Sequence, residues 1–351
     1  MKLFCLLTLV GAALLPAATM YSVVNLGSFG GSSSVAYHID NAGVVVGWSQ
    51  TTLNDNHAFS STGGSPHDMN QAAASNSFAY GDNSSGQIVG TSYIDGQTHG
   101  TLWSGSGVSD LGAGTSAMSI NANGQVAGGN GHAFVYNNGQ FTDLGTLSGG
   151  NWSAGYGIND NGMVAGYGST ANGFRAFTWT ASAGLNMLGT LGGNSSYAMG
   201  INNQGQVAGH SIAADGYAHA FIANNGILKD LGTVGSNSYA YGLNNAGAVV
   251  GYNPAGAFLY NGALLNLNSL IGSNSGWQLQ QAYGINDSGK IVGTGLFQGQ
   301  SRAFELDPLI LGQAVPAVAA VPEPGSIALL GMGLTLIVVA RRTRVRVRRN
   351  P

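Results

Sequence analysis

Charged residues are scarce in this sequence of 351 residues, because Asp, Glu, Lys and Arg together make up only 7% of it. Cysteine occurs once, as Cys5, so the rest of the chain can form neither a disulfide nor a cysteine metal site. A disordered chain would combine high net charge with few apolar residues, whereas here 44% are hydrophobic and the net charge is −3. We therefore expect a packed core.

The few charges are segregated along the chain. Six of the eleven basic residues lie in the last eleven positions, and the stretch between the two ends holds thirteen acidic residues but only four basic ones. An acidic body repels phosphate backbones, so the sequence predicts no nucleic-acid partner.

Glycine is abundant, with 58 residues, and much of it belongs to an internal repeat. A turn of the form Asx-x-x-Gly recurs at intervals of 43, 38, 38, 43, 42 and 42 residues, ending at Gly43, Gly86, Gly124, Gly162, Gly205, Gly247 and Gly289. An Asx at the first position and a glycine at the fourth are typical of a short β-hairpin turn whose last residue is left-handed. The spacing predicts seven equivalent units of about 40 residues.

Each unit contains an aromatic signature after the hairpin. The signature reads His-Ala-Phe in its clearest copies, with histidines at His57, His132 and His219, a variant at His99, and phenylalanines at Phe59, Phe134, Phe177, Phe221, Phe258 and Phe304. A further strand ends in Asp-Leu-Gly or a weaker version of it. Four short strands per unit predict an all-β fold, a seven-bladed β-propeller, with a β-solenoid as the alternative.

The ends of the repeat region favour a closed ring. The seventh unit lacks its Asp-Leu-Gly strand, while an unattached copy of that strand stands at residues 24–31. If this N-terminal strand completes the last blade, the first and last units are locked together.

These units resemble the HAF repeat of bacterial extracellular proteins, over most of residues 21–306. The resemblance is strongest in units four and five and weakest in unit two, where Gly81-Asp82-Asn83 replaces Gly-Ile-Asn and Thr101 takes the Phe position. It implies an extracellular role without fixing an activity.

The N-terminus has the three regions of a secretory signal peptide. Lys2 precedes an apolar run that ends at small residues, and we expect cleavage near Ala18 or Thr19. A buried first strand or an uncleaved anchor is the alternative.

The C-terminus combines three features in a fixed order: a Pro-Glu-Pro motif, an apolar stretch at 325–340 and an arginine cluster. The motif and the first basic residues are Val321, Pro322, Glu323, Pro324, Arg341, Arg342 and Arg344. By the positive-inside rule the arginines stay cytoplasmic and the repeat body lies across the membrane.

This order resembles the PEP-CTERM sorting signal of Gram-negative bacteria, whose members are thought to be processed by an exosortase and delivered to the cell surface or the exopolysaccharide matrix. It implies that the helix is a transient inner-membrane anchor, cut near Pro322 to Pro324. An ordinary single-span anchor is the alternative. The expected processing partners are signal peptidase and exosortase.

The sequence thus divides into a signal peptide (1–19), a repeat propeller (20–310), a linker (311–320) and a sorting segment (321–351) whose transmembrane helix spans 325–340. The expected location is outside the inner membrane, first tethered by the C-terminal helix and then at the cell surface or in the matrix.

Residues that could carry chemistry do not form a known catalytic motif. The repeated histidines alternate with arginine and glycine at the same position, so we interpret them as structural, each hydrogen-bonding its own blade. His38, His67 and His210 show no partner spacing. We predict no cofactor; calcium in the oxygen-rich turns is the alternative, disfavoured because no Asp-x-Asp-x-Asp run is followed by a glutamate.

The leading functional hypothesis is a non-catalytic, exported propeller with a structural or ligand-recognition role, and extracellular polysaccharide as a candidate partner. Aromatic residues at strand ends are candidate carbohydrate platforms, with blade core as the alternative role: Trp152, Tyr156, Trp179, Tyr197 and Tyr239. The competing hypothesis is an extracellular hydrolase or lyase acting on polysaccharide, disfavoured because Glu305 is the only glutamate in the body.

Overall fold

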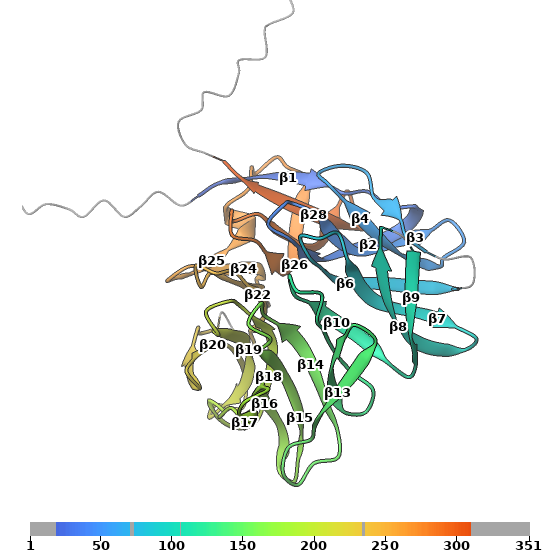
Figure 1. Cartoon of the computed structure of the whole chain (residues 1–351). Helices are drawn as coiled ribbons and strands as arrows, with labels where there is room; N and C mark the ends of the chain where they lie inside the picture. Colours follow the sequence, from blue (N-terminus) through green and yellow to red (C-terminus); the bar gives the residue numbers. More distant parts are fainter. Residues whose placement is uncertain (1–18, 71–73, 106, 234–235, 310–351) are drawn as a thin grey trace, which may run out of the picture. The chain divides into compact units, whose positions relative to one another are not determined.

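Seven four-stranded antiparallel sheets follow one another along the chain (Figure 1). They are seen in a computed structural model that describes residues 19–70, 74–105, 107–233 and 236–309. Each sheet is one blade of a β-propeller, so the predicted all-β, seven-bladed fold is confirmed and the solenoid alternative is wrong. We number the blades one to seven from the hairpin turns at Gly43 to Gly289.

In blades one to six the four strands run outward in chain order, whereas blade seven has β26, β27 and β28 in that order with β1 outermost. The innermost strands are β2 (Gly30–Ile39), β6 (Asn76–Asp82), β10 (Ser116–Ile120), β14 (Ser153–Ile158), β18 (Gly192–Ile201), β22 (Tyr239–Leu243) and β26 (Trp277–Ile285). The second strands are β3 (Val45–Thr51), β7 (Ile88–Ile94), β11 (Val126–Gly129), β15 (Val164–Thr170), β19 (Val207–Ala213), β23 (Val249–Asn253) and β27 (Ile291–Phe297).

The third strands carry the His-Ala-Phe signature. They are β4 (Asn56–Ser61), β8 (Gln97–Ser104), β12 (Ala133–Asn137), β16 (Gly173–Thr180), β20 (Ala218–Asn224), β24 (Gly256–Tyr260) and β28 (Gln300–Pro308). The outer strands are β5 (His67–Asp68), β9 (Gly107–Ala113), β13 (Gln140–Gly145), β17 (Gly184–Met187), β21 (Ile227–Asp230), β25 (Leu264–Asn266) and, for blade seven, β1 (Tyr21–Asn25). A short 3₁₀ helix, η1 (Leu267–Ser269), follows β25.

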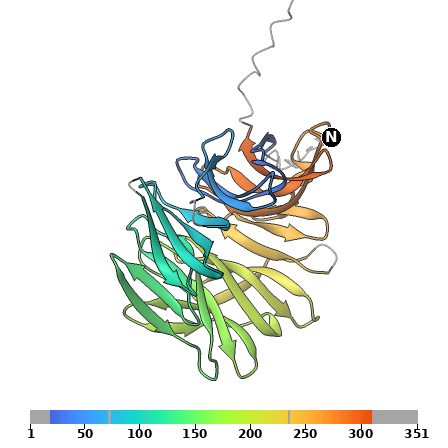
Figure 2. The same ribbon diagram turned by 90° about the vertical axis from the view of Figure 1, so that its right-hand side faces the viewer.

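The ring closes through the N-terminal strand, as the truncated seventh unit predicted. β1 pairs antiparallel with β28, from Tyr21 opposite Pro308 to Asn25 opposite Phe304. Figures 1 and 2 show this blue strand beside the orange β28, and the inner strands β2 and β26 also contact each other. Blade seven is therefore assembled from both ends of the repeat region.

The repeated hairpin turn has the backbone that its sequence predicts. The N–H of Gly43 donates to the carbonyl of Asp40 at 3.1 Å, and the N–H of Asp40 donates to the carbonyl of Val44 at 3.0 Å. All seven turn glycines have φ between 73° and 85°, a region that side chains resist. The same turn therefore ends every inner strand.

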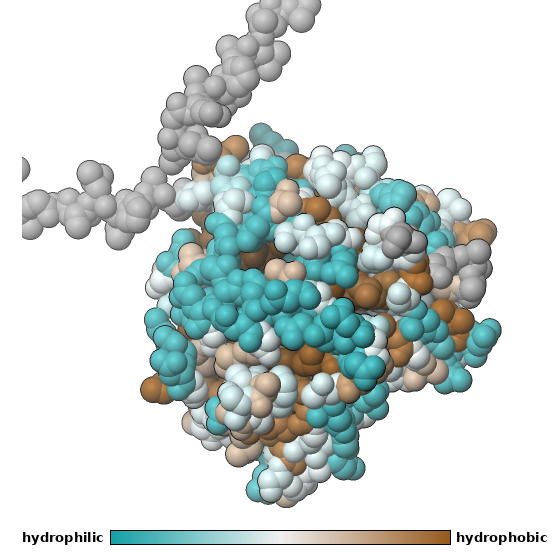
Figure 3. Space-filling model, viewed as in Figure 1, coloured by the Kyte–Doolittle hydropathy of each residue, from teal (hydrophilic) through white to brown (hydrophobic). Residues whose placement is uncertain are grey.

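The core consists of separate hydrophobic clusters along the ring, built from repeated positions. The signature phenylalanines are all at most 1% exposed: Phe59, Phe134, Phe177, Phe221, Phe258 and Phe304. Burying one such side chain stabilises a fold by roughly 1.5–3 kcal/mol. On the surface, Figure 3 shows hydrophilic residues, in teal, forming a band across the middle of the face viewed, with smaller brown hydrophobic patches around it.

Several predicted segments lie outside the described residues: nearly all of the signal peptide, the linker and the whole sorting segment with its helix at 325–340. In the part of the chain that is described, no helix has the length and apolar character needed to cross a membrane.

Candidate functional site

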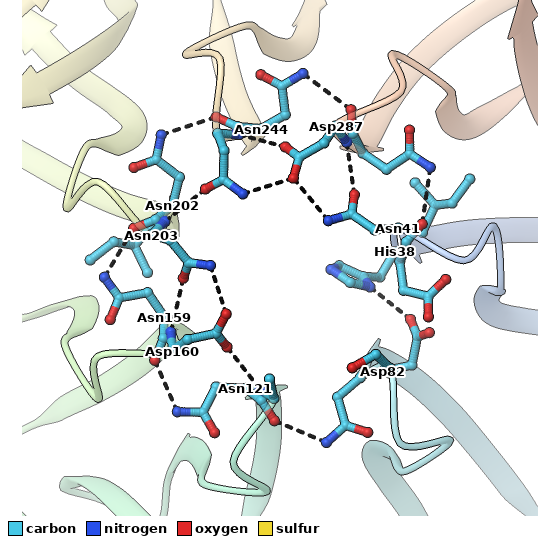
Figure 4. A pocket seen from close by; sticks show the side chains of 18 of the residues that line it. His38, Asn41, Asp82, Asn121, Asn159, Asp160, Asn202, Asn203, Asn244 and Asp287 are labelled. Carbon is cyan, nitrogen blue, oxygen red and sulfur yellow. Dashed lines mark hydrogen bonds and ion pairs between the residues drawn. The ribbon is translucent and has the colours of Figure 1, made fainter.

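The hairpin turns of the seven inner strands meet at one mouth of the central channel and are joined by side-chain amides (Figure 4). The first Asx side chain of a turn accepts N–H groups of its own turn through Oδ1, as Asn202 does from Gln204 and Gln206. In six blades the Nδ2 of this residue also donates to the main-chain carbonyl of the equivalent residue in the next blade, at 2.9–3.1 Å. The donors are Asn83, Asn121, Asn159, Asn202, Asn244 and Asn286. These bonds stitch blade to blade, and we call them the amide ladder.

The amide ladder is open at one place only. Blade one carries Asp40 at the ladder position, and an ionised carboxylate has no N–H to donate. The carbonyl of Asn83 in blade two therefore receives the N–H of its own turn but no amide from blade one. The open step lies between blades one and two.

A second tier of contacts shows the same asymmetry. Asp287 accepts from the N–H and the amide of Asn245 at 2.8 Å, and Asn41 and Asp287 are joined by two bonds of 2.8 and 2.9 Å. Blades two and three have the short side chains of Ser84 and Ala122 at this position. Both tiers are thus weakest beside blade two.

A histidine and an aspartate from neighbouring blades face each other at the open step. His38 on β2 and Asp82 on β6 are joined by a 2.7 Å contact between Nδ1 and Oδ1. The Asp82 side chain is 1% exposed, while that of His38 is 43% exposed toward the channel. Burial raises the pKa of the Asp82 carboxyl, although His38 acts in the opposite direction; burial would lower the pKa of His38, but Asp82 raises it overall.

The mouth encloses a cavity of about 210 Å³. Its wall consists of the turn residues just described, with an isoleucine or leucine beneath each turn except that of blade two. Polar groups therefore dominate this end of the channel.

The part of the inner strands that precedes the turns is aromatic, and a β-bulge recurs within it; we call this part the aromatic end. In each blade one residue of the inner strand, three positions before the ladder residue, is skipped by the pairing register. The skipped residues are Tyr37, Tyr80, Met118, Tyr156, Met199, Tyr241 and Tyr283. Five tyrosines and two methionines therefore occupy equivalent places around the ring.

A glycine in the second strand makes room for each bulge. A Cβ on Gly209 would stand 1.9 Å from the carbonyl oxygen of Tyr197, and a Cβ on Gly47 would stand 2.0 Å from that of Val35. Contacts this short are excluded, so the glycine that ends the Val-x-Gly run is required by the bulge. The repeated glycine of the second strand thus explains the aromatic end, as the repeated glycine of the hairpin explains the turn end.

Neighbouring aromatic side chains continue from these bulges into one chain of ring contacts, with centroids 4.8–6.5 Å apart. We call it the aromatic arc, and in order it contains Trp48, Phe78, Tyr80, Tyr37, Tyr283, Tyr241, Tyr252, Tyr239, His210, Tyr197, Tyr167 and Trp152, with Tyr156 and Phe174 against Tyr167. Blade three interrupts it with Met118 and Gly129.

The arc is not part of the blade cores. Phe174 is exposed and the other rings are half-buried, and none of them belongs to the hydrophobic clusters found among the described residues. Of the five candidate platforms from the sequence, Trp152, Tyr156, Tyr197 and Tyr239 lie in the arc, while Trp179 packs on a blade core.

Three tyrosine hydroxyls and one imidazole of the arc stay uncharged at neutral pH. Burial raises the pKa of the Tyr156, Tyr241 and Tyr283 hydroxyls, so these groups stay protonated and can donate. Burial lowers the pKa of His210 to about 4, and its Nδ1 has no hydrogen-bond partner within the described ranges. The arc thus combines apolar ring faces with neutral hydrogen-bonding groups.

The signature histidines do not line the cavity at the turn mouth and instead bind their own blades. Each pairs through Nδ1 with the aspartate eleven residues later, at 2.7–3.0 Å: His57 with Asp68, His99 with Asp110, His132 with Asp143 and His219 with Asp230. The same aspartate caps its own turn, as Asp230 does for the N–H of Gly232 at 2.7 Å. The structural role of these histidines stays a prediction, and these pairs are the contacts through which they would fulfil it.

Other acidic residues offer little support for catalysis. Glu305 is 1% exposed and contacts Lys290 at 2.7 Å, and Lys290 also pairs with Asp307. Among the described residues, no three His, Cys, Asp or Glu side chains are placed to hold one metal ion.

Neither the pairing of His38 with Asp82 nor the convergence of the arc was predicted from the sequence. The sequence does indicate the pair in one way, because Asp82 departs from the repeat at a position where the other units have isoleucine or leucine. The arc is signalled by the Tyr or Met three positions before each ladder residue.

Comparison with protein families finds the PEP-CTERM protein-sorting motif at residues 320–345, which supports the C-terminal sorting signal and implies an exported protein. The resemblance to HAF repeats stays a prediction. No curated protein matches the sequence.

Several solved structures are similar in fold at low identity. A gluconolactonase of Xanthomonas campestris is 12% identical, with 66% of this chain and 86% of that chain covered and a TM-score of 0.41. TolB of Acinetobacter baumannii is 12% identical, with 81% and 65% covered and a TM-score of 0.45. The lectin of Aleuria aurantia, described as a six-bladed β-propeller with a fucose recognition mode, is 11% identical, with 81% and 93% covered and a TM-score of 0.37.

Proposed function

We propose that this protein is an exported, non-catalytic recognition propeller that binds extracellular polysaccharide through the aromatic arc, at the cell surface or in the exopolysaccharide matrix. The observation that carries the proposal is the arc itself: a run of half-exposed aromatic rings across six of the seven blades that contributes nothing to the blade cores.

The chemistry of the arc suits a sugar. Tyr and Trp rings offer flat apolar faces together with a polar handle, and sites for small polar ligands combine apolar walls with a few placed hydrogen-bonding groups. Here the handles include the hydroxyls of Tyr156 and Tyr241 and the imidazole of His210, all neutral at neutral pH. A neutral donor set favours hydroxyl-rich ligands over anions.

The sorting signal supports the location. A PEP-CTERM motif at residues 320–345 directs export, and the predicted signal peptide begins the same route. The exosortase and signal peptidase are proposed as processing enzymes, with the helix at 325–340 as a transient anchor.

The test is binding of the full-length chain, in neutral detergent, to polysaccharides of the bacterial envelope and matrix. Tyr197→Ala combined with Tyr239→Ala removes two rings on either side of His210, and we expect at least about a tenfold loss of affinity. Tyr217→Ala is the matched control, because Tyr217 lies in the same blade as Tyr197, is 48% exposed and is outside the arc. Equal affinity of the double variant and the control, or no binding by the folded wild type, would overturn the proposal.

The hydrolase or lyase hypothesis has one candidate active site, because Asp40 and Asp82 line the same cavity at the turn mouth. It requires the release of shortened or unsaturated chains from a polysaccharide, with the activity lost in Asp82→Ile. Binding without such products favours the recognition role.

A further inference from the structure

The open step between blades one and two differs from its six counterparts at three positions at once. His38 stands where five blades have glycine and blade three has Ser119, Asp82 stands where the others have isoleucine or leucine, and Asp40 stands where the others have asparagine. Because six blades close the same ring without these residues, the fold does not require them. Three polar substitutions at one interface indicate a function there.

Hydrogen-bond acceptors at this step outnumber donors. His38 satisfies Oδ1 of Asp82, but Oδ2 of the same carboxylate has no partner within the described residues, although the side chain is 1% exposed. The carbonyl of Asn83 lacks the amide that the equivalent carbonyl of every other blade receives. Leaving a buried carboxylate oxygen unpaired is costly, so the site is built for a donor that it does not itself supply.

Apart from His38, the ionisable groups around the step are all acidic. Four aspartates line the cavity, namely Asp40, Asp82, Asp160 and Asp287, and its described wall includes no lysine or arginine. Asp160 and Asp287 are already engaged with neighbouring amides and N–H groups. Asp40 and Asp82 each have one carboxylate oxygen engaged, by the N–H of Val44 and by Nδ1 of His38, so the remaining acceptor capacity lies at these two residues. Figure 4 shows the Asp82 carboxylate directed toward His38 across the interface.

A cation with N–H groups matches this arrangement better than a metal ion does. No three acidic or histidine side chains of the described chain converge on one point, as a metal would need. A guanidinium or alkylammonium group instead brings several directed donors, which pair strongly with carboxylates and carbonyls. We propose that the open step between blades one and two binds a guanidinium or alkylammonium group through Asp82, Asp40 and the carbonyl of Asn83.

The cavity of about 210 Å³ has room for such a head group. The site lies at the turn mouth and shares no residue with the aromatic arc, so it stands or falls independently of saccharide binding.

In the experiment, the full-length chain in neutral detergent is titrated with methylguanidinium, n-propylammonium and tetramethylammonium, and binding is measured by calorimetry. Tetramethylammonium has the same charge but no N–H, so we expect it to bind at least about tenfold more weakly than methylguanidinium. Agmatine and acetyl-arginine methylamide then distinguish a free cation from a peptide side chain as the source.

Asp82→Ile is the informative variant, because isoleucine is the residue of the repeat and should leave the blade intact. We expect it to lower the affinity for methylguanidinium by at least about tenfold, while Asp160→Asn, which removes the same charge elsewhere in the mouth, changes it by less than about threefold. Equal binding by wild type and Asp82→Ile, equal binding of tetramethylammonium and methylguanidinium, or no saturable binding by a chain that is folded by circular dichroism, would each overturn the proposal.

Discussion

The two ends of the seven inner strands differ in how strictly they repeat. At the turn end nearly every blade presents the same asparagine, glycine and interblade amide bond, with one departure at Asp40. At the aromatic end the bulge recurs, but the side chains beyond it vary from Trp48 to Thr91, Gly129 and His210. The difference suggests that the turn end closes the ring, whereas the aromatic end and the single departure at the turn end are available for ligands.

The largest effect is expected from filling the space that one bulge occupies. Gly209→Ala places a Cβ 1.9 Å from the carbonyl of Tyr197, so the bulge of blade five must move, and we expect a loss of about 3 kcal/mol in the free energy of unfolding. Urea unfolding monitored by tryptophan fluorescence measures it. Gly189→Ala is the control, because a Cβ there meets nothing within 4 Å. Similar unfolding midpoints for both variants would contradict the role assigned to Gly209.

A second prediction concerns acid stability at the aromatic end. Burial lowers the pKa of His210 to about 4, whereas an unfolded histidine titrates near 6.5, so the unfolded chain binds a proton that the folded chain refuses in between. The free energy of unfolding therefore falls by about 1–3 kcal/mol as the pH drops from about 6.5 toward 4, and above about pH 6.5 His210 causes no such loss. Thermal unfolding across this range, compared with His210→Tyr, measures it.

Tyrosine is a suitable replacement, because blades four and six carry Tyr167 and Tyr252 at the same position. If the variant lost as much stability in acid as the wild type, His210 would not be the group responsible.

A third prediction tests the amide ladder by placing an aspartate, the residue of blade one, at the ladder position of another blade. Asn202→Asp keeps the acceptor for the turn but removes the amide that donates to the carbonyl of Asn244 at 3.0 Å. We expect a loss of about 1–2 kcal/mol, the usual cost of leaving a buried acceptor unpaired. Asn172→Asp, at an exposed hairpin, gives the baseline for the charge change. A difference within error between the two variants in urea unfolding would show that the amide ladder does not hold the ring.

The reverse change, from aspartate to asparagine in blade one, should have the smallest effect on stability. Asp40→Asn supplies an amide where the amide ladder is open, and Oδ1 can still accept the N–H of Val44. We expect stabilisation of about 1 kcal/mol. An unchanged or lower melting temperature would mean that blades one and two are too far apart for the missing bond.

Much of this architecture could be predicted from the sequence, because turn chemistry and core positions recur along the chain. Gly43 and its counterparts have positive φ, and Phe59 and its counterparts are buried. The seventh repeat lacks its outer strand, and the strand before Leu26 supplies it. These are properties of a single unit, which a repeat displays several times.

The candidate sites could not be predicted in the same way, because they arise between units. His38 and Asp82 are 44 residues apart and meet only through the curvature of the ring. The arc depends on the bulges, which shift the alternation of the strand by one residue, so that Tyr37 and Tyr283 face each other although simple alternation would not place them there.

The seam in blade seven also has a consequence for when the protein can fold. β1 cannot pair until residues 300–308 are present, and closing so long a loop carries an entropic cost before any contact compensates for it. Six blades can form in succession behind the moving chain, but the seventh waits for the last strand, so completion of the ring should be the slow step. A protein that must cross a membrane before it folds would gain from this delay, since the chain stays open until its final repeat has passed.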